Sequence, residues 1–275
     1  MTKITMTKTT DFKPKNYEFW SFGNCNLEFV CNLVLGIWSL FFISGCSTVY
    51  NPATGRQEIQ FVSTQEEINI GANISKQIEA ELGILNDPAS EGRLNYIGQR
   101  LAAVSDRKDL PYYFKIIKDN SFNAFTILGG HVYVNSGLFV KVSSDSELAA
   151  VLSHEIAHVA ARHPAKALEA NLGYQILMSL IFKDGENANL QQAVDISMGL
   201  IRNGYSRQDE LLADRLGIRY MTKANYNPQA YVDLLEKLQA MEGNEPGSIG
   251  EFFSSHTAAS DRIMAAKAEI KNTLK

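Results

Sequence analysis

The stretch VLSHEIAHVAARH, residues 151–163, constrains the fold of this chain more than any other part of the sequence. It holds three of the chain's five histidines, and His154 and His158 lie four positions apart within it. On an α-helix, residues at this spacing lie one above the other on the same face. The stretch therefore predicts a helix that presents two imidazoles side by side.

Neighbouring residues predict the two ends of this helix. Ser144-Asp145-Ser146-Glu147 has the Ser-x-x-Glu pattern of a capping box, which is typical of a helix N-terminus. Pro164 disfavours helical geometry at the residue before it. We therefore expect the helix to end near His163.

His154, Glu155 and His158 together form the pattern H-E-x-x-H. Two imidazoles at this spacing can bind one Zn²⁺ ion without bending the helix. Glu155 would then lie beside the metal, where it can deprotonate an attacking water molecule. For this pentapeptide alone, a helix that carries histidines without a metal remains the alternative.

A catalytic zinc needs a third protein ligand and an open fourth position. The motif in which a third histidine follows six residues after the second is excluded, because Pro164 stands there. Glu210 and Asp214 are better candidates, since they are again four residues apart on a predicted helix. Glu210 can bind the zinc while Asp214 accepts a hydrogen bond from a ligand histidine. The alternative for this pair is a solvated helix face, and we assign His163 a structural or surface role.

The rest of the chain predicts an α+β fold that is mainly helical. Residues 112–117 are rich in aromatic and β-branched side chains, and Gly129-Gly130 separates two β-prone runs, which is typical of a hairpin. The second run suits an edge strand to which an extended peptide could add, with a core hairpin as the alternative. That run consists of His131, Val132, Tyr133, Val134 and Asn135. Helices are predicted over residues 63–82, 87–103, 165–182, 188–204, 207–223, 228–241 and 258–273.

Charge and cysteine content exclude several classes of protein. The net charge is -4 and the chain has no run of Lys or Arg, so nucleic acid is not an expected partner. Its three cysteines are Cys25, Cys31 and Cys46, and none follows them. The main domain therefore has neither a disulfide framework nor a cysteine-based zinc site.

The first 46 residues resemble a bacterial lipoprotein signal. Leu33–Ile43 is uncharged and apolar, which suits a signal-peptide core and is short for a membrane span. It leads into Ile43-Ser44-Gly45-Cys46, and in such signals the cysteine is lipidated and becomes the mature N-terminus. Ser47 is typical of sorting to the outer membrane. An uncleaved signal anchor or a buried segment remains the alternative.

Five runs resemble the family-48 zinc metallopeptidases, in family order and over residues 47–272. The family includes the HtpX, CAAX prenyl protease and Oma types, and bacterial lipoproteins of the LoiP and BepA kind. The runs are NPATGRQEIQFVSTQEE, NAFTILGGHVYVNSGLF, ELAAVLSHEIAHVAARH, SRQDELLADRLG and FFSSHTAASDRI. This chain departs from the family at Thr257, where members commonly have proline. It resembles the short members that lack a helical-repeat domain.

The resemblance implies a gluzincin with a zincin-like fold and a small sheet beside the H-E-x-x-H helix. It implies one Zn²⁺ per chain, bound by His154, His158 and Glu210, with Glu155 as general base. His256 would donate to the oxyanion or bind the zinc in a latent state, with a non-catalytic loop histidine as the alternative. Arg262 would support either arrangement through an ion pair, for example with Asp214.

The implied function is a zinc endopeptidase that hydrolyses unfolded or misassembled cell-envelope proteins as quality control. The implied domains are a signal peptide at 1–45, an extended segment at 46–62 and one metallopeptidase domain at 63–275. The expected location is the envelope, anchored by lipidated Cys46 to the outer membrane and facing the periplasm. Expected partners are unfolded polypeptide, the membrane and envelope assembly machinery. The competing hypotheses are a non-catalytic chaperone that keeps the zinc site, and a structural zinc with His256 as fourth ligand.

Overall fold

The computed structural model describes residues 48–182, 187–242, 256 and 259–273. From Thr48 onward the chain forms one compact unit. The predicted signal peptide and Cys46 lie outside the described residues. Among the helices that are described, none is both long enough and apolar enough to cross a membrane.

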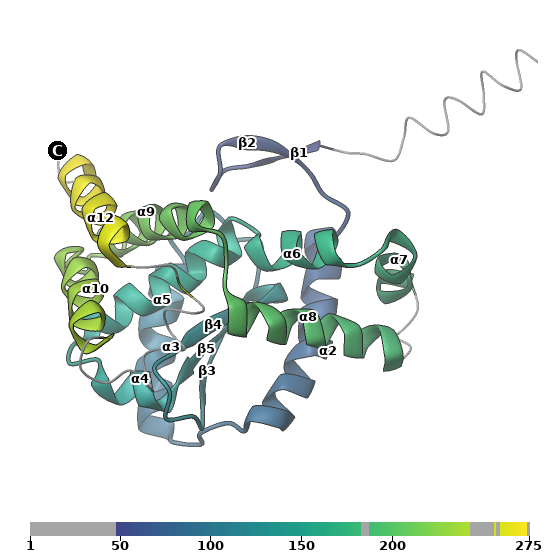
Figure 1. The fold of residues 1–275 in the computed structure, drawn as a ribbon, viewed down its shortest axis with the longest axis horizontal. Coiled ribbons are helices and arrows are strands. Elements are labelled where there is room, and N and C mark those ends of the chain that lie inside the picture. Colours follow the sequence, from purple (N-terminus) through teal and green to yellow (C-terminus); the bar gives the residue numbers. More distant parts are fainter. Residues whose placement is uncertain (1–47, 183–186, 243–255, 257–258, 274–275) are drawn as a thin grey trace, which may run out of the picture. The chain divides into compact units, whose positions relative to one another are not determined.

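A three-stranded sheet lies at the centre of the fold (Figure 1). Its strands are β3 (Tyr113–Ile117), β4 (Ala124–Ile127) and β5 (His131–Asn135), in the order β3-β5-β4. β5 pairs with β4 antiparallel across the turn Leu128–Gly130, which confirms the predicted hairpin. β3 precedes this hairpin in the chain and pairs in parallel with the other side of β5.

The prediction that His131–Asn135 is an edge strand is wrong. β3 occupies one side of this strand and β4 the other, so β5 is the central strand of the sheet. The hairpin pattern identified two adjacent strands but could not show which of them β3 would join. Within the described residues, β4 is the strand that keeps an open side next to the H-E-x-x-H helix.

That helix is α5 (Asp145–Ala160), and it runs through the centre of the core. Its N-cap Ser144 accepts a hydrogen bond from Glu147 N, as the capping pattern predicts. Every residue from Leu148 to Ala160 is buried, which explains why the helix is apolar on all sides. It ends three residues before His163, because Arg162 adopts a left-handed conformation with φ of 61°.

Helices cover both faces of the sheet and form two cores. One core includes α3 (Pro88–Ala102), α5, α9 (Arg207–Lys223), α10 (Gln229–Glu242) and α12 (Ala259–Thr273). The other includes α2 (Thr64–Leu82), α6 (His163–Asn171), α7 (Tyr174–Phe182) and α8 (Asn187–Asn203). The predicted helix 165–182 is therefore two helices, while the other predicted helices are confirmed with small shifts at their ends. A short helix, α4 (Ser136–Lys141), follows β5. The predicted extended segment contains a hairpin of β1 (Thr48–Asn51) and β2 (Arg56–Ile59).

A glycine sets how closely α9 packs on α5. A Cβ atom at Gly217 would lie 3.1 Å from Ser153 Oγ and 3.2 Å from His154 N, so a side chain there would require α5 to shift by a few tenths of an ångström. This close packing brings the two helices with i, i+4 polar pairs together, although some fifty residues separate them in the sequence.

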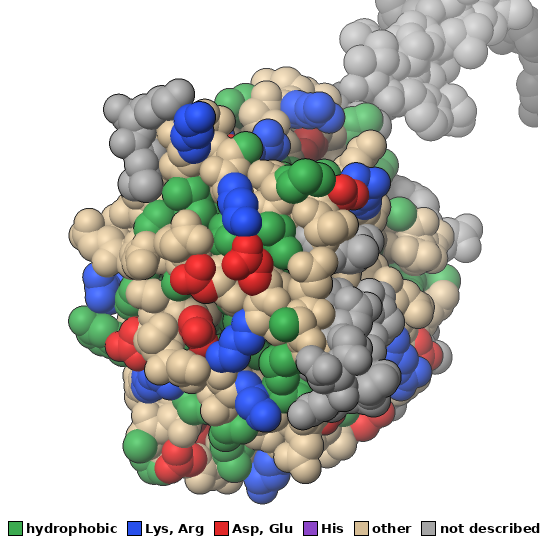
Figure 2. All heavy atoms as spheres, turned by 60° about the vertical axis from the view of Figure 1, so that its left-hand side comes forward, with side chains coloured by type: hydrophobic (Ala, Val, Ile, Leu, Met, Phe, Trp, Pro, Cys, Tyr) green, Lys and Arg blue, Asp and Glu red, His purple; other side chains and the backbone are tan. Residues whose placement is uncertain are grey.

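All five histidines are buried, and none is visible on the face drawn in Figure 2. On that face, acidic and basic side chains are mixed. The contacts of the histidines are therefore with residues in the interior of the protein.

Candidate active site

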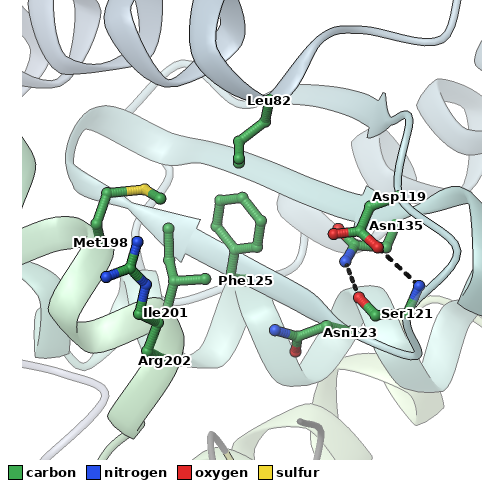
Figure 3. A pocket seen from close by; sticks show the side chains of 9 residues that line it. All are labelled: Leu82, Asp119, Ser121, Asn123, Phe125, Asn135, Met198, Ile201 and Arg202. Carbon is green, nitrogen blue, oxygen red and sulfur yellow. Dashed lines mark hydrogen bonds between the residues drawn. The ribbon is translucent and has the colours of Figure 1, made fainter. Parts of the chain in front are cut away.

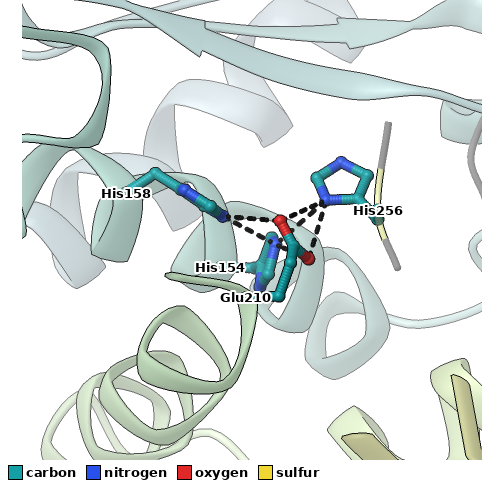
Figure 4. A group of neighbouring side chains, drawn as sticks. All are labelled: His154, His158, Glu210 and His256. Atoms are coloured by element: carbon teal, nitrogen blue, oxygen red, sulfur yellow. Dashed lines mark hydrogen bonds and ion pairs between the residues drawn. The ribbon is translucent and has the colours of Figure 1, made fainter. Parts of the chain in front are cut away.

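The imidazoles of His154 and His158 project from α5 toward Glu210 and His256 (Figure 4). Their Nε2 atoms are 3.1 Å apart. Glu210, on α9, faces both rings, with Oε2 at 3.4 Å from His154 Nε2 and Oε1 at 3.3 Å from His158 Nε2. The three side chains predicted as ligands are thus together, and all are buried.

These distances fit a tetrahedral zinc ion. Zinc–nitrogen and zinc–oxygen bonds of about 2.0–2.1 Å, at the tetrahedral angle, place neighbouring ligand atoms about 3.3 Å apart. The nearest atoms of His154, His158 and Glu210 lie 3.1 to 3.4 Å apart, and each imidazole faces a different oxygen of the Glu210 carboxylate. Two histidines and a glutamate are also a donor set of catalytic zinc sites.

His256 lies at the fourth corner of this group. Its Nδ1 is 3.3 Å from His154 Nε2 and 3.1 Å from Glu210 Oε2. The ligand atoms of all four residues lie within 4.8 Å of one another. The other nitrogen, Nε2, is 3.5 Å from Ala124 O on β4 and 3.9 Å from Glu155 Oε1.

The outer nitrogens of both helix histidines also have partners. His154 Nδ1 lies 2.8 Å from Tyr231 Oη and 3.1 Å from Asp214 Oδ1, and Tyr231 donates to that same oxygen at 2.7 Å. His158 Nδ1 lies 2.9 Å from His163 Nδ1. Such contacts fix the tautomer and the orientation of a ligand imidazole.

The sequence identified Asp214 but missed Tyr231 and the contact of His163. No pattern around Tyr231 distinguishes it from an ordinary core tyrosine. The sequence predicts only a structural or surface role for His163, because the helix is expected to continue nearly to it. The left-handed residue Arg162 turns the chain instead, so that His163 faces back toward His158.

Arg262 forms the predicted ion pair with Asp214. Its Nε and Nη2 donate to the two carboxylate oxygens at 2.8 and 2.6 Å, and its Nη1 lies 3.0 Å from Glu210 Oε2. Burial raises the pKa of the Asp214 carboxyl, but the Arg262 guanidinium outweighs it and holds that pKa far below its ordinary value. Arg262 thereby connects α12 to the helix of the third ligand.

The charges around the site favour a cation. Glu155, Glu210 and Asp214 are three buried carboxylates, and Arg262 is the buried cation described beside them. Burial works against a charged imidazole, but the Glu210 and Asp214 carboxylates raise the pKa of His154 to about 9. Burial raises the pKa of the Glu155 carboxyl, which makes it a better proton acceptor.

A buried His-His-Glu group on two helices, with a glutamate beside its first histidine, defines the class of zinc metallopeptidases. A family model described as peptidase family M48 matches residues 88–270. The chain therefore belongs to peptidase family M48.

Named relatives include bacterial and mitochondrial proteases. The beta-barrel assembly-enhancing protease of Escherichia coli (strain K12) is 29% identical over 229 residues, covering 78% of this chain and 46% of the relative. The mitochondrial metalloendopeptidase OMA1 of Schizosaccharomyces pombe is 30% identical over 221 residues, covering 78% of this chain and 64% of the relative. OMA1 of Saccharomyces cerevisiae is 29% identical over 250 residues, covering 84% of this chain and 71% of the relative. This chain thus spans about half the length of the bacterial relative, whose covered share is 46%.

Replacing Asp214 by Asn should lower zinc affinity by about 10- to 100-fold, because the hydrogen bond that orients His154 is weakened. Competition with a chromogenic chelator measures this affinity. Asp233→Asn, an exposed substitution of the same kind on α10, should leave it unchanged. Equal affinities in folded Asp214→Asn and wild type would contradict a role for Asp214 in the metal site.

Proposed function

We propose that this chain is a zinc-dependent endopeptidase whose metal is held by His154, His158 and Glu210. The observation that carries the proposal is the buried group of three ligand side chains at tetrahedral spacing, with Glu155 on the same helix. When bound there, zinc polarises the scissile carbonyl and lowers the pKa of a water molecule.

Glu155 is the proposed general base. It accepts a proton from the attacking water and later returns it to the leaving amine. Its side chain lies in a cavity with Ala124, Thr126 and His256, so the proton acceptor faces the space between α5 and β4. Because the Glu155 carboxylate is buried, bulk water does not compete for hydrogen bonds to it.

His256 is proposed to have two positions. In the arrangement described above, its Nδ1 is close enough to Glu210 and His154 to complete a four-ligand group. A substrate carbonyl needs that same corner, so His256 must withdraw before turnover. In its withdrawn position, His256 is proposed to donate to the oxyanion.

We propose β4, in place of β5, as the strand that binds an extended substrate. Asn135 N donates to Asn123 O, so the alternation of an antiparallel pair directs the backbone groups of Ala124 and Thr126 away from β5. Both residues line the cavity that contains Glu155. A peptide that adds to this edge would lie beside the catalytic glutamate, and main-chain bonding would demand little of its sequence.

A second cavity, of about 270 Å³, extends from the first along the α8 side of the sheet (Figure 3). The two cavities share Phe125 and Ile201. Cross-strand neighbours point their side chains to the same face, so a substrate residue opposite Phe125 would direct its side chain into this space. Leu82 and Met198 give it apolar walls, while Asp119 and Ser121 lie at its polar end.

We infer that the substrates are unfolded or misassembled proteins of a bacterial cell envelope, because a folded chain offers no extended segment to an edge strand. The names of the bacterial relatives support an envelope setting. Lipidation at Cys46, an outer-membrane position facing the periplasm and contact with envelope assembly machinery belong to the same proposal. The proposed domains remain 1–45, 46–62 and 63–275.

The substitution Glu155→Gln should abolish cleavage of casein while zinc remains bound, because the amide cannot accept the proton. We expect a loss of at least about 100-fold in kcat/KM. Glu236→Gln, an exposed change of the same chemistry, should retain full activity. If Glu155→Gln cleaves casein like wild type, the non-catalytic chaperone becomes the better explanation.

Substrate binding along β4 predicts a two-residue period. Methylating single peptide nitrogens, away from the scissile bond, should raise KM by about 2- to 10-fold at alternate residues only, since every second N–H faces the strand. The intervening positions are the control. An equal effect at all positions, or none, would argue against strand addition.

The proposed anchor predicts that Cys46→Ser leaves the precursor unprocessed or releases the protein from the membrane. Mass spectrometry of the N-terminus and partition into detergent measure the two outcomes. Cys31→Ser is the matched control and should be processed normally. Unchanged membrane association of Cys46→Ser would favour an uncleaved signal anchor.

A further inference from the structure

Tyr205 lies directly against the proposed metal site. Its ring stacks on that of His158, with centroids 4.2 Å apart and an interplanar angle of 27°. It also borders the cavity that contains Glu155 and His256. None of the functions assigned above uses this side chain.

The backbone holds Tyr205 firmly on both sides. Gly204 ends α8 with a φ of 69°, and its N–H donates to Leu200 O at 2.7 Å. Ser206 is the N-cap of α9, and its side chain accepts a hydrogen bond from Asp209 N. Tyr205 therefore lies between the residue that ends α8 and the N-cap of α9, with its ring stacked on His158.

The hydroxyl of Tyr205 is buried, although the residue as a whole is partly exposed, so the ring points inward. No side chain or backbone group of the described residues forms a hydrogen bond with this Oη. A buried hydroxyl without a partner lowers stability, because it has given up its hydrogen bonds to water. Phenylalanine would stack on His158 equally well and avoid that cost, so packing does not account for the oxygen.

We propose that Tyr205 is a catalytic residue whose hydroxyl donates a hydrogen bond to the scissile carbonyl oxygen as negative charge develops on it. The proposal deepens the endopeptidase function and rests on it. Tyrosine has an ordinary pKa of about 10, so its hydroxyl carries a proton at neutral pH. A donor fixed in a water-poor cavity stabilises developing charge without reorganising.

The roles of Tyr205 and His256 differ in this scheme. His256 lies at the fourth corner of the ligand group and must withdraw before a substrate binds. Tyr205 stacks on His158 and is fixed by the ends of α8 and α9. Once His256 has withdrawn, Tyr205 can therefore act on the substrate without leaving its place.

The test compares Tyr205→Phe with Tyr226→Phe. Tyr226 is the matched control, because it is a second partly buried tyrosine, and its ring lies against Arg100 instead of the metal site. In Tyr205→Phe, kcat for a peptide substrate should fall by about 100-fold while KM stays unchanged. Tyr226→Phe should match wild type in both.

Binding of an inhibitor supplies a readout other than turnover. A phosphinic peptide carries a tetrahedral oxyanion, and calorimetry measures its Kd. Tyr205→Phe should bind it about 100-fold more weakly, with zinc content unchanged and a Tm no lower than that of wild type.

The outcomes separate the two proposals. If wild type and Tyr226→Phe cleave casein, Glu155→Gln does not, and Tyr205→Phe keeps the wild-type kcat and inhibitor Kd, the role of Tyr205 is overturned while the endopeptidase stands. Loss of zinc in Tyr205→Phe would also overturn it, since the residue would then only position His158. If wild type itself cleaves nothing, the endopeptidase function has failed.

Discussion

The close packing of α9 on α5 is the constraint on which the rest of the structure depends. Gly217 allows the helices to approach, and this approach places the Glu210 carboxylate against two imidazoles at the centre of the core. A charged group that is 0% exposed is costly unless it is paired or bound to a metal. Arg262 and the proposed zinc supply that compensation. The fold thus keeps a highly polar centre inside an apolar shell.

The parts of this site that the sequence could predict are those encoded within one helix. The spacing of His154 and His158 is a local property, and so is the pair Glu210 and Asp214. The family resemblance was needed to predict that these two pairs lie together in space, because no local pattern encodes the contact between α5 and α9. The helices were predicted well for the same local reason, with errors where one residue changes the chain direction, as Arg162 does.

The errors have a common physical origin in long-range contacts. The hairpin of β4 and β5 follows from the Gly-Gly turn, but the edge of the sheet depends on where β3 pairs, ten or more residues earlier in the chain. Tyr231 reaches His154 from a helix whose pattern is that of ordinary core packing. Tyr205 stands between two helices at a position with no motif. The role of each of these residues depends on contacts with residues that are distant in the sequence.

The contact between Arg262 and Asp214 has a consequence for biosynthesis. The guanidinium that balances the buried carboxylates lies on α12, so the charged centre lacks its counter-ion until α12 has been made. Domains generally fold as the chain is synthesised from its N-terminus. A ribosome-bound fragment that ends before α12 therefore holds the histidines but not the complete centre. The order of the residues along the chain therefore delays the assembly of the charged centre until α12 has been synthesised.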